Sequence, residues 1–304
     1  KMITIAIDAM GGDGSPKKII DGINHHYKST SDVFYKIYGD QEQISKFLPS
    51  TLNQKSFKIF DTKNIVKGTD TPLEAAKRGK DTSMWLAIES VKKKEADVVI
   101  SAGNTGALLV ISKLNLKMIE NIDKPALSAL WPNKKGMSVV LDLGANIECS
   151  DKNLIDFAIM GSSLFKSLYP DETAKVALLN IGSEEIKGNE VIKETYKKLN
   201  QVENLDFEFK GYIEGNNLMK GEVNVIVSDG FTGNIALKTA EGTANFITEE
   251  LKKALTNNII GKLSGLLNYM NLKKFKKRLD PRLYNGAIFI GLDSPVIKSH
   301  GSTD

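Results

Sequence analysis

The sequence predicts an α/β fold: a three-layer α/β/α, doubly wound arrangement on a mostly parallel sheet. Short runs rich in Val and Ile alternate with segments of helical periodicity. The apolar runs are nearly continuous, which is typical of strands buried on both faces. Five of them stop in a loop of Gly, Asn, Asp, Ser and Thr. Such sheets bind ligands beyond the carboxyl ends of their strands, so these loops are the candidate binding sites.

We expect strands at residues 2–7, 33–38, 56–60, 98–100, 126–130, 138–141, 175–180, 206–212, 223–227 and 286–290. Helical periodicity predicts helices over 16–27, 81–94, 104–116, 151–168, 189–199 and 235–255, some with caps such as Asp81 and Asp151. No low-complexity linker interrupts the pattern. We therefore expect a single domain over residues 1–304, with a helical, basic and amphipathic excursion near 245–282.

The composition, 304 residues with 41% hydrophobic and 26% charged, is that of an ordinary globular protein. No run of about 18 uncharged apolar residues and no secretory leader occurs in the sequence, so we expect a cytoplasmic protein. Cys149 is the single cysteine, and the three histidines lie outside any metal-binding motif. We expect no disulfide, no metal and no cofactor.

The positive charge is concentrated in one segment. Residues 252–279 contain eight Lys and Arg and no Asp or Glu, whereas the rest of the chain is net negative. Seven apolar residues recur over residues 251–279 at roughly helical spacing, namely Leu251, Leu255, Ile259, Leu263, Leu266, Leu267 and Met270. Gly261 and Gly265 are expected to interrupt the helix and place the apolar residues near a tip. The pattern suits an anionic membrane surface or an acidic protein, or else a dimer-interface or core-covering helix hairpin with a solvated Lys face.

Two loops share the pattern Ser-x-Gly-x-Thr-Gly, at residues 101–106 and 228–233, and each precedes a predicted helix. A helix N-terminus offers free N–H groups and the positive end of its dipole, so the pattern predicts two anion sites. The loop at residues 8–16 has three glycines but matches neither a dinucleotide-binding nor a P-loop motif. It is also compatible with a simple tight turn.

The remaining two loops cover residues 141–146 and 180–190, and the second contains Lys187. A cation at a helix start is disfavoured by the dipole, which indicates that Lys187 binds an anion, although a solvated charge is the alternative. The loops offer N–H groups, amides, hydroxyls and one lysine, without an evident nucleophile and base pair. They suit holding an anion and stabilising an oxyanion, with the bound anion as the nucleophile.

Seven motifs in order along the chain resemble the PlsX family of bacterial phosphate acyltransferases. They are IAIDAMGGD at 5–13, SAGNTGALL at 101–109, DLGAN at 142–146, LLNIG at 178–182, KGNE at 187–190, DGFTGN at 229–234 and HGS at 300–302. The resemblance implies that inorganic phosphate attacks the thioester of acyl-acyl carrier protein and yields acyl phosphate for phospholipid synthesis. It also implies a homodimer and a fold like those of isocitrate and isopropylmalate dehydrogenases and of phosphate acetyltransferase.

Transferred residue by residue, the resemblance implies Lys187 and Asn234 as the catalytic pair. We expect the phosphate or substrate to be bound by Asp8, Gly11, Gly12, Ser101, Asn104, Thr105, Gly106, Asn146, Asn189, Asp229, Thr232, Gly233 and His300. Contact with a membrane or the carrier protein is expected from Ile259, Ile260, Lys262, Leu266, Leu267, Lys273 and Lys274. Further implied partners are an anionic membrane and a membrane glycerol-phosphate acyltransferase, and we expect no nucleic acid.

Two features depart from the family pattern or lie beside it. Gly14 stands where a larger polar residue is common, and the sequence ends at Asp304, where we expect the N-cap of a further helix. Alternatives remain: a CoA-dependent phosphate acetyltransferase, a metal-dependent decarboxylating dehydrogenase, or a non-catalytic, membrane-recruited anion-binding scaffold. Cys149 is expected to be a buried structural thiol rather than a nucleophile.

Overall fold

The computed structural model describes residues 2–30, 32–279 and 286–299, except for the side chains of residues 259, 262 and 276–279. Packing divides the chain into two compact units. Unit 1 comprises Lys1–Ser128 and Gly286–Asp304, and unit 2 comprises Ala129–Asn285. The single domain expected over residues 1–304 stays a prediction, since nothing in the composition marks a boundary between the units.

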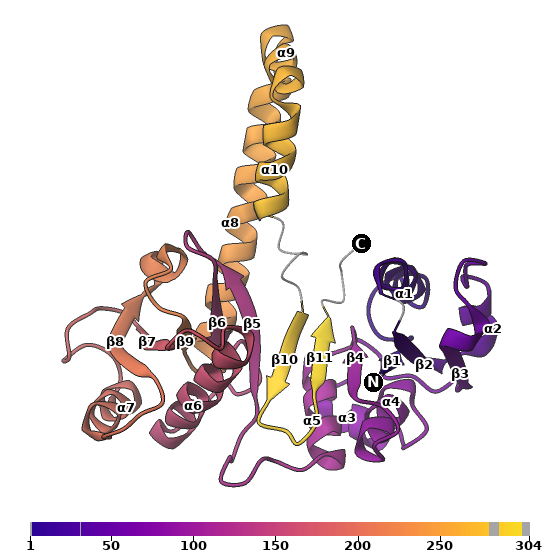
Figure 1. The fold of residues 1–304 in the computed structure, drawn as a ribbon, viewed down its shortest axis with the longest axis horizontal. Helices are drawn as coiled ribbons and strands as arrows, with labels where there is room; N and C mark the ends of the chain where they lie inside the picture. The colour runs from indigo at the N-terminus through magenta and orange to yellow at the C-terminus, as the bar shows by residue number, and fades with distance from the viewer. Residues whose placement is uncertain (1, 31, 280–285, 300–304) are drawn as a thin grey trace. The chain divides into compact units, whose positions relative to one another are not determined.

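In unit 1 the strand order is β3-β2-β1-β4-β11-β10, with β10 antiparallel to β11 and the other pairs parallel (Figure 1). The strands are β1 (Ile3–Asp8), β2 (Val33–Gly39), β3 (Phe57–Asp61), β4 (Val98–Ser101), β10 (Gly286–Ile290) and β11 (Val296–Ser299). The helices are α1 (Lys17–Ser29), α2 (Gln41–Ser45), α3 (Pro72–Lys77), α4 (Ser83–Lys92) and α5 (Thr105–Asn115), with a 3₁₀ turn at Gln54–Ser56. Strands β1, β2 and β4 therefore end at one edge of the sheet.

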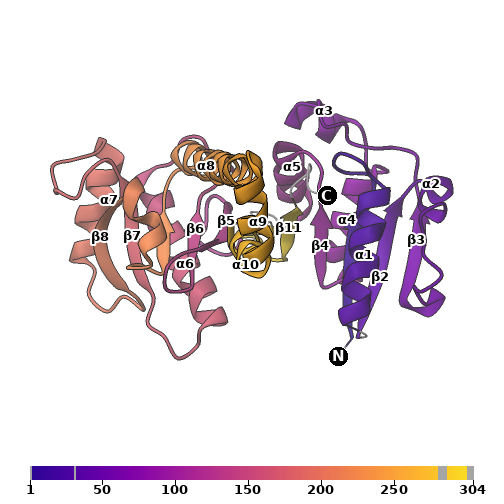
Figure 2. The same ribbon diagram turned by 90° about the horizontal axis from the view of Figure 1, so that it is seen from above.

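The core of unit 1 forms where α1 meets the sheet. Ile20 and Ile23 of α1 pack against side chains such as Ile7 and Ile37, which lie on one face of β1 and β2 because strand side chains alternate. Helix α4 packs against the same strands outside this cluster. Seen from above, helices flank the strands in each unit (Figure 2).

In unit 2 the order is β5-β6-β9-β7-β8, with β5 antiparallel to β6 and the other pairs parallel. The strands are β5 (Ala126–Pro132), which begins just before the boundary, β6 (Met137–Leu141), β7 (Lys175–Asn180), β8 (Glu208–Glu214) and β9 (Val225–Val227). Helices α6 (Asp151–Leu168) and α7 (Glu190–Gln201) and a 3₁₀ turn at Gly215–Lys220 connect them. The register places Leu141 and Leu178 on either side of Val227, so three loops leave the sheet at one level.

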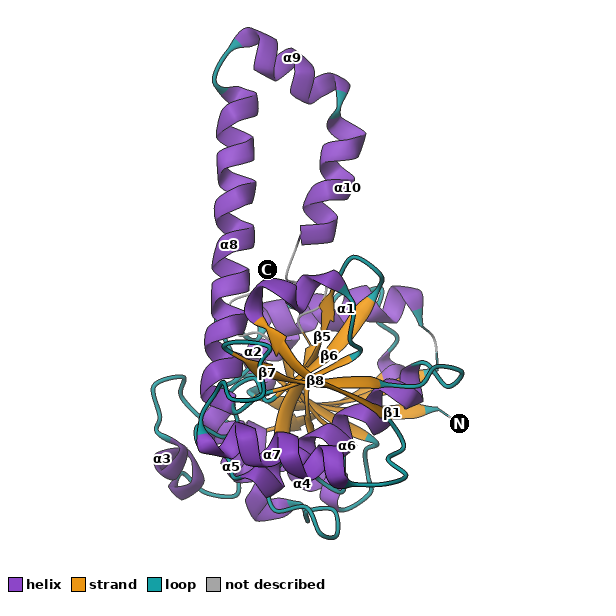
Figure 3. Cartoon of the chain, turned by 90° about the vertical axis from the view of Figure 1, so that its left-hand side faces the viewer, coloured by secondary structure: helices purple, strands orange, loops and turns teal. Residues whose placement is uncertain are grey.

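The excursion in unit 2 consists of three helices, α8 (Gly230–Thr256), α9 (Ile259–Leu267) and α10 (Tyr269–Leu279). Helix α9 lies between the end of α8 and the start of α10 (Figure 3). The expected breaks at Gly261 and Gly265 are wrong, because both glycines lie inside α9. The chain turns instead beside Asn258, whose side chain caps α9 by accepting a hydrogen bond from the Gly261 N–H at 2.6 Å.

The α/β class and the mostly parallel sheet with flanking helices are confirmed. The strands and helices predicted from periodicity are all present. Those at residues 151–168, 175–180 and 286–290 have the predicted ends, and the others have shifted ends. Strand β11 and the short helices α2 and α3 are additions to the predicted set.

Candidate functional site

In unit 1 the buried carboxylate of Asp8 joins three elements at the end of β1. The Ser83 and Ser101 hydroxyls each donate a hydrogen bond to it at 2.7 Å, and the Met10 N–H donates at 3.2 Å. Burial raises the pKa of Asp8 above its usual value, although these donors act in the opposite direction. Asp8 therefore anchors the loop after β1 to β4 and to the start of α4.

Backbone contact between the two unit 1 loops requires glycine. A Cβ on Gly11 would lie 2.6 Å from the Gly103 nitrogen, and Gly12 has a φ of +88°. Asn104 caps α5 by accepting from the Ala107 N–H at 2.9 Å and donates from Nδ2 to the Gly68 carbonyl at 3.0 Å. Both ends of the Asn104 amide therefore bond to the protein backbone and stabilise the loop.

The N-terminus of α5 fits the anion-site expectation in part. Within the described chain, the Thr105 and Gly106 N–H groups have no hydrogen-bond acceptor, and the cap is a neutral Asn. Unit 1 thus brings together seven of the predicted residues, Asp8, Gly11, Gly12, Ser101, Asn104, Thr105 and Gly106. His300 lies outside the described residues.

Unit 2 repeats the arrangement with Asp142, which directly follows β6 and is fully buried. Its carboxylate accepts hydrogen bonds from the Gly144, Ala145 and Asn146 N–H groups at 3.2, 3.0 and 2.8 Å. The Asn146 side-chain amide donates to it as well, at 2.8 Å. Asp142 fixes the loop over residues 142–146, and the expected role of Asn146 is part of this anchor.

The start of α8 packs directly on this loop. A Cβ on Gly233 would lie 1.9 Å from the Asp142 carbonyl oxygen, and one on Gly230 would lie 2.5 Å from the Asn146 carbonyl oxygen. The Gly230 N–H donates to that Asn146 oxygen at 2.7 Å. Only glycine permits this approach of helix and loop.

Asn234 in the first turn of α8 has a fixed amide orientation. Its Nδ2 donates to the Leu143 carbonyl at 3.1 Å, so Nδ2 must face the loop. Gly144, with a φ of +132°, leaves the space, because a Cβ there would lie 2.9 Å from this Nδ2. The second Nδ2 hydrogen and Oδ1 remain for a ligand, since Asn234 is otherwise exposed.

The α8 N-terminus differs from the expected nest of free N–H groups. The Asp229 carboxylate accepts from the Thr232 N–H at 2.8 Å and from its hydroxyl at 2.9 Å. The Asp229 carbonyl accepts from Gly233, which leaves Phe231 as the one N–H of the first four without an acceptor among the described residues. Asp229, Thr232 and Gly233 therefore build the helix start and do not form the expected anion site of free N–H groups.

Lys187 supplies the positive charge at this edge. The preceding loop closes on Asn180, whose Nδ2 donates to the Lys187 carbonyl at 3.1 Å and whose Oδ1 accepts from the Ile181 N–H at 2.9 Å. The Lys187 side chain is exposed, and its ammonium forms no ion pair with a described residue. Asn189 caps α7 through the Ile192 N–H at 2.9 Å.

The carboxyl edge of unit 2, where β6, β9 and β7 end, therefore gathers Lys187, Asn234 and the loop anchors. Asp142, Asn180 and Ser83 are further anchors beyond the predicted site residues. The sequence feature that could have identified these anchors is a polar residue next to a glycine loop, either at the end of an apolar strand or at a helix start. Within the described chain, no group of three His, Cys, Asp or Glu side chains suits a metal ion.

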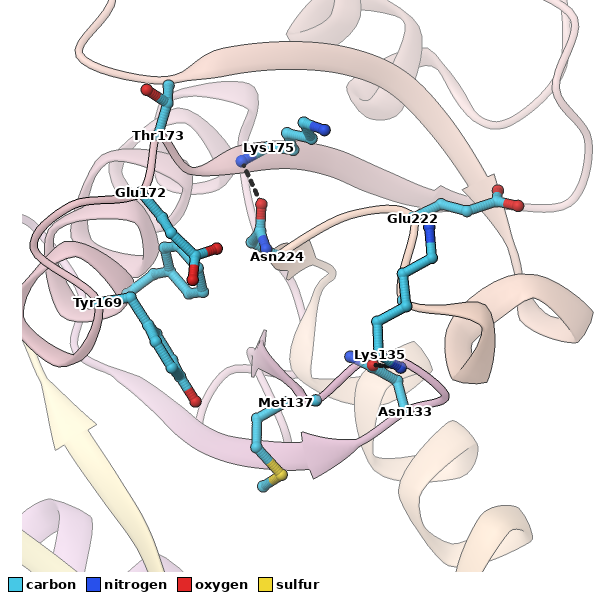
Figure 4. A pocket seen from close by; sticks show the side chains of 12 residues that line it. Asn133, Lys135, Met137, Tyr169, Glu172, Thr173, Lys175, Glu222 and Asn224 are labelled. Carbon is cyan, nitrogen blue, oxygen red and sulfur yellow. Dashed lines mark hydrogen bonds between the residues drawn. The ribbon is translucent and has the colours of Figure 1, made fainter.

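A pocket of about 450 Å³ lies at the opposite edge of unit 2, where β6, β7 and β9 begin (Figure 4). Tyr169, Glu172 and Lys135 line it, and the Lys175 N–H donates to Asn224 Oδ1 at 2.9 Å beside them. None of the predicted site residues reaches this pocket. It is separate from the candidate site.

Residues 3–304 match the family described as "Fatty acid synthesis protein". The chain is 81% identical over 304 residues to the phosphate acyltransferase of Pelagibacter ubique, covering 100% of this chain and 91% of that protein. It is 43% identical to the phosphate acyltransferase of Maricaulis maris, covering 99% and 87%.

Solved structures show the same fold at low identity. A phosphotransacetylase from Streptococcus pyogenes has a TM-score of 0.61 at 15% identity, covering 97% of this chain and 87% of that one. A branched-chain phosphotransacylase from Enterococcus faecalis has a TM-score of 0.59 at 13% identity, covering 100% and 94%. With the sequence relatives, these findings show that the chain belongs to the PlsX family of phosphate acyltransferases, which are acyltransferase enzymes.

Proposed function

We propose that this acyltransferase transfers the acyl group of acyl-acyl carrier protein to inorganic phosphate, giving acyl phosphate for phospholipid synthesis. The observation that carries the proposal is that Lys187 and the oriented amide of Asn234 both lie at the edge of unit 2 where β6, β9 and β7 end. A phosphate needs a cation, and a developing oxyanion needs a positioned N–H donor. The edge offers both.

In the proposed reaction, Lys187 holds the hydrogen phosphate dianion while one phosphate oxygen attacks the thioester carbonyl carbon. The Asn234 Nδ2–H that does not bond Leu143 donates to the carbonyl oxygen as it becomes negative. The intermediate then collapses, the C–S bond breaks, and the sulfur takes the proton that the phosphate carried. A thiol with a pKa of about 8.5 leaves without a strong general acid.

The proposal contains no acyl-enzyme intermediate. Cys149, the one thiol, lies near the anchor loop and contacts the Asn146 carbonyl oxygen with its Sγ at 3.8 Å. A carbonyl oxygen cannot take the proton of a thiol as a general base does. In this proposal the bound phosphate is the nucleophile.

The direct test measures thiol release from acyl-acyl carrier protein with and without inorganic phosphate, with acetyl-CoA as the competing donor. We expect release that saturates with phosphate and is much faster with the carrier-linked substrate. Equal release without phosphate, or a preference for acetyl-CoA, would contradict the proposal and favour a thioesterase or an acetyltransferase. Phosphate binding without any thiol release would favour the scaffold alternative.

No helix among the described residues is long and apolar enough to span a membrane. We propose that α9 instead contacts an anionic membrane surface from the cytoplasm. Ile260, Leu266 and Leu267 on α9 are all more than 70% exposed. Lys273 and Lys274 follow on α10 without a nearby acidic residue in sequence. Apolar side chains at a tip with flanking lysines are typical of interfacial binding. The side chains of Ile259 and Lys262 are outside the description.

Vesicle flotation tests the membrane contact. The double substitution Ile260→Glu and Leu267→Glu should abolish binding to vesicles rich in phosphatidylglycerol, and salt should weaken the wild-type binding. Ile159→Glu with Leu168→Glu on α6 is the matched control, because it makes the same charge change at exposed apolar positions. Equal flotation of wild type and the α9 variant would exclude α9 as the contact.

The proposal also includes a homodimer and delivery of acyl phosphate to a membrane glycerol-phosphate acyltransferase. Phe246 and Ile247 on α8 are 64% and 45% exposed in the single chain, and a second copy would cover them. Sedimentation of wild type and Phe246→Ser tests the dimer. A monomeric wild-type chain would contradict it.

A further inference from the structure

Large exposed apolar side chains occur next to the polar residues at the carboxyl edge of unit 2. Five of them are between 52% and 81% exposed, namely Ile147, Ile181, Ile186, Phe231 and Ile235. Each is the direct neighbour in sequence of a residue of the candidate site or its anchors, which are Asn146, Asn180, Lys187, Gly230 and Asn234. We call these five residues the apolar rim.

The apolar rim is grouped in space by the sheet. Its members lie in the loops after β6 and β7 and in the first turns of α8, which follows β9. These three parallel strands are neighbours about 4.8 Å apart, so the loops leave the sheet within about 10 Å of one another. Phe231 and Ile235 are four residues apart on α8 and share one face.

Such grouping differs from ordinary surface exposure. Single exposed apolar side chains are common, whereas several around a polar centre mark a binding surface. The loops are well anchored by Asp142 and Asn180, so the exposure does not come from a loose segment. Such a surface suits a ligand that is polar at its centre and apolar around it.

We propose that the apolar rim binds the hydrocarbon chain of the acyl group and gives the enzyme its preference for long chains. The inference rests on the proposed function. The reacting carbonyl lies at Asn234, and the alkyl chain begins at that same carbon. The first side chains it meets are those next in sequence to the polar site. The alkyl chain then displaces water from the apolar rim, and this removal of apolar surface from water favours binding.

The magnitude follows from hydrocarbon burial. Each methylene that moves from water to apolar contact favours binding by about fourfold. Contact with only two or three methylenes therefore changes kcat/KM by roughly 10- to 60-fold between long and short chains. A rim of five large side chains is sufficient for contact of this size.

The test uses the double variant Ile181→Ser and Ile186→Ser, because these two side chains are the most exposed of the rim. Hexadecanoyl and butanoyl groups on the same carrier protein are compared, so that contacts with the carrier cancel. We expect the ratio of kcat/KM for the long to the short chain to fall at least tenfold. Leu168→Ser at the end of α6 is the control and should leave the ratio unchanged, because Leu168 is next to Tyr169 of the pocket at the opposite edge of unit 2.

The outcomes separate the possible errors. An unchanged ratio in the Ile181 and Ile186 variant overturns the inference, and so does an equal loss for both chains. Conversion of an oligomer to monomers by the variant, seen in sedimentation, would show that a second copy covers the rim. Absence of phosphate-dependent thiol release by wild type with either chain would contradict the proposed function itself.

Discussion

Gly233→Ala tests how the enzyme positions Asn234. The added Cβ would lie 1.9 Å from the Asp142 carbonyl oxygen, and ordinary contact begins at 3.4 Å. The first turn of α8 and the loop over residues 142–146 must therefore separate by about 1.5 Å if the substitution is to fit. The 3.1 Å hydrogen bond from Asn234 Nδ2 to Leu143 would then be lost.

The displacement has two measurable effects. Misplacing a reacting or positioning group by about 1 Å costs roughly 10²-fold in rate, so kcat of thiol release should fall by about that factor. Overpacking also costs about 1–3 kcal/mol of unfolding free energy, which urea titration measures. Asn234 is held by one neutral hydrogen bond, so its displacement should lower the rate of the folded enzyme itself. The fall in kcat should therefore be larger than the increase in the unfolded fraction can account for.

Gly242→Ala is the matched control in the same helix. No atom lies within 4 Å of its added Cβ, and Ala favours a helix interior over Gly by about 1 kcal/mol. This variant should be slightly more stable and fully active. A Gly233→Ala protein with the kcat and stability of wild type would refute the reasoning that the packing of α8 on Asp142 sets the site.

Three further predictions concern individual side chains. Lys187→Ala should lower kcat/KM for thiol release by roughly 10²-fold without lowering the urea midpoint, because its side chain is exposed. Asn234→Ala should lower kcat/KM by a similar factor and also lower the urea midpoint slightly, because it removes the hydrogen bond to the Leu143 carbonyl. Wild-type rates in both would remove them from the site. For Asp8, burial raises the pKa above 3.8, so the folded state binds its proton more readily than the unfolded state does. The unfolding free energy of wild type minus that of Asp8→Asn should therefore fall as pH rises from about 4 and then level off; a rise would contradict this. Cys149→Ala should keep most activity, and a stable acyl adduct on Cys149 in mass spectrometry would overturn direct attack by phosphate.

Local sequence periodicity was sufficient to predict the sheet and the main helices, because buried strands and amphipathic helices repeat their apolar residues at different intervals. Strand β11 has four residues, of which Lys298 and Ser299 are polar, so it carries no such repeat. It forms because β4 and β10 offer hydrogen-bonding partners on either side. Strand β4 lies nearly 200 residues before β11 in the sequence, so a local sequence pattern cannot show this pairing.

The candidate site was predicted in its residues more than in their roles. The glycine loops indicated anion binding by free N–H groups at helix N-termini. The capping side chains of Asn104 and Asp229, however, accept hydrogen bonds from some of these N–H groups. The buried anchor Asp8 depends on hydroxyls 75 and 93 residues away. The apolar rim was also missed, because Ile next to Asn or Lys in a sequence does not show whether its side chain is covered.

The length of α8 sets a physical scale for the enzyme. Its first turn carries Asn234, and its last residue, Thr256, precedes α9. At 1.5 Å per residue, about 33 Å of helix without a proline separates the oriented amide from the apolar tip. The helix thus acts as a spacer of fixed length: if the tip rests on a membrane, chemistry takes place well above the lipid headgroups. The acyl phosphate of the proposed reaction would then have to cross that interval in water or be passed on directly, and shortening α8 by whole turns would shorten the interval in steps of 5.4 Å.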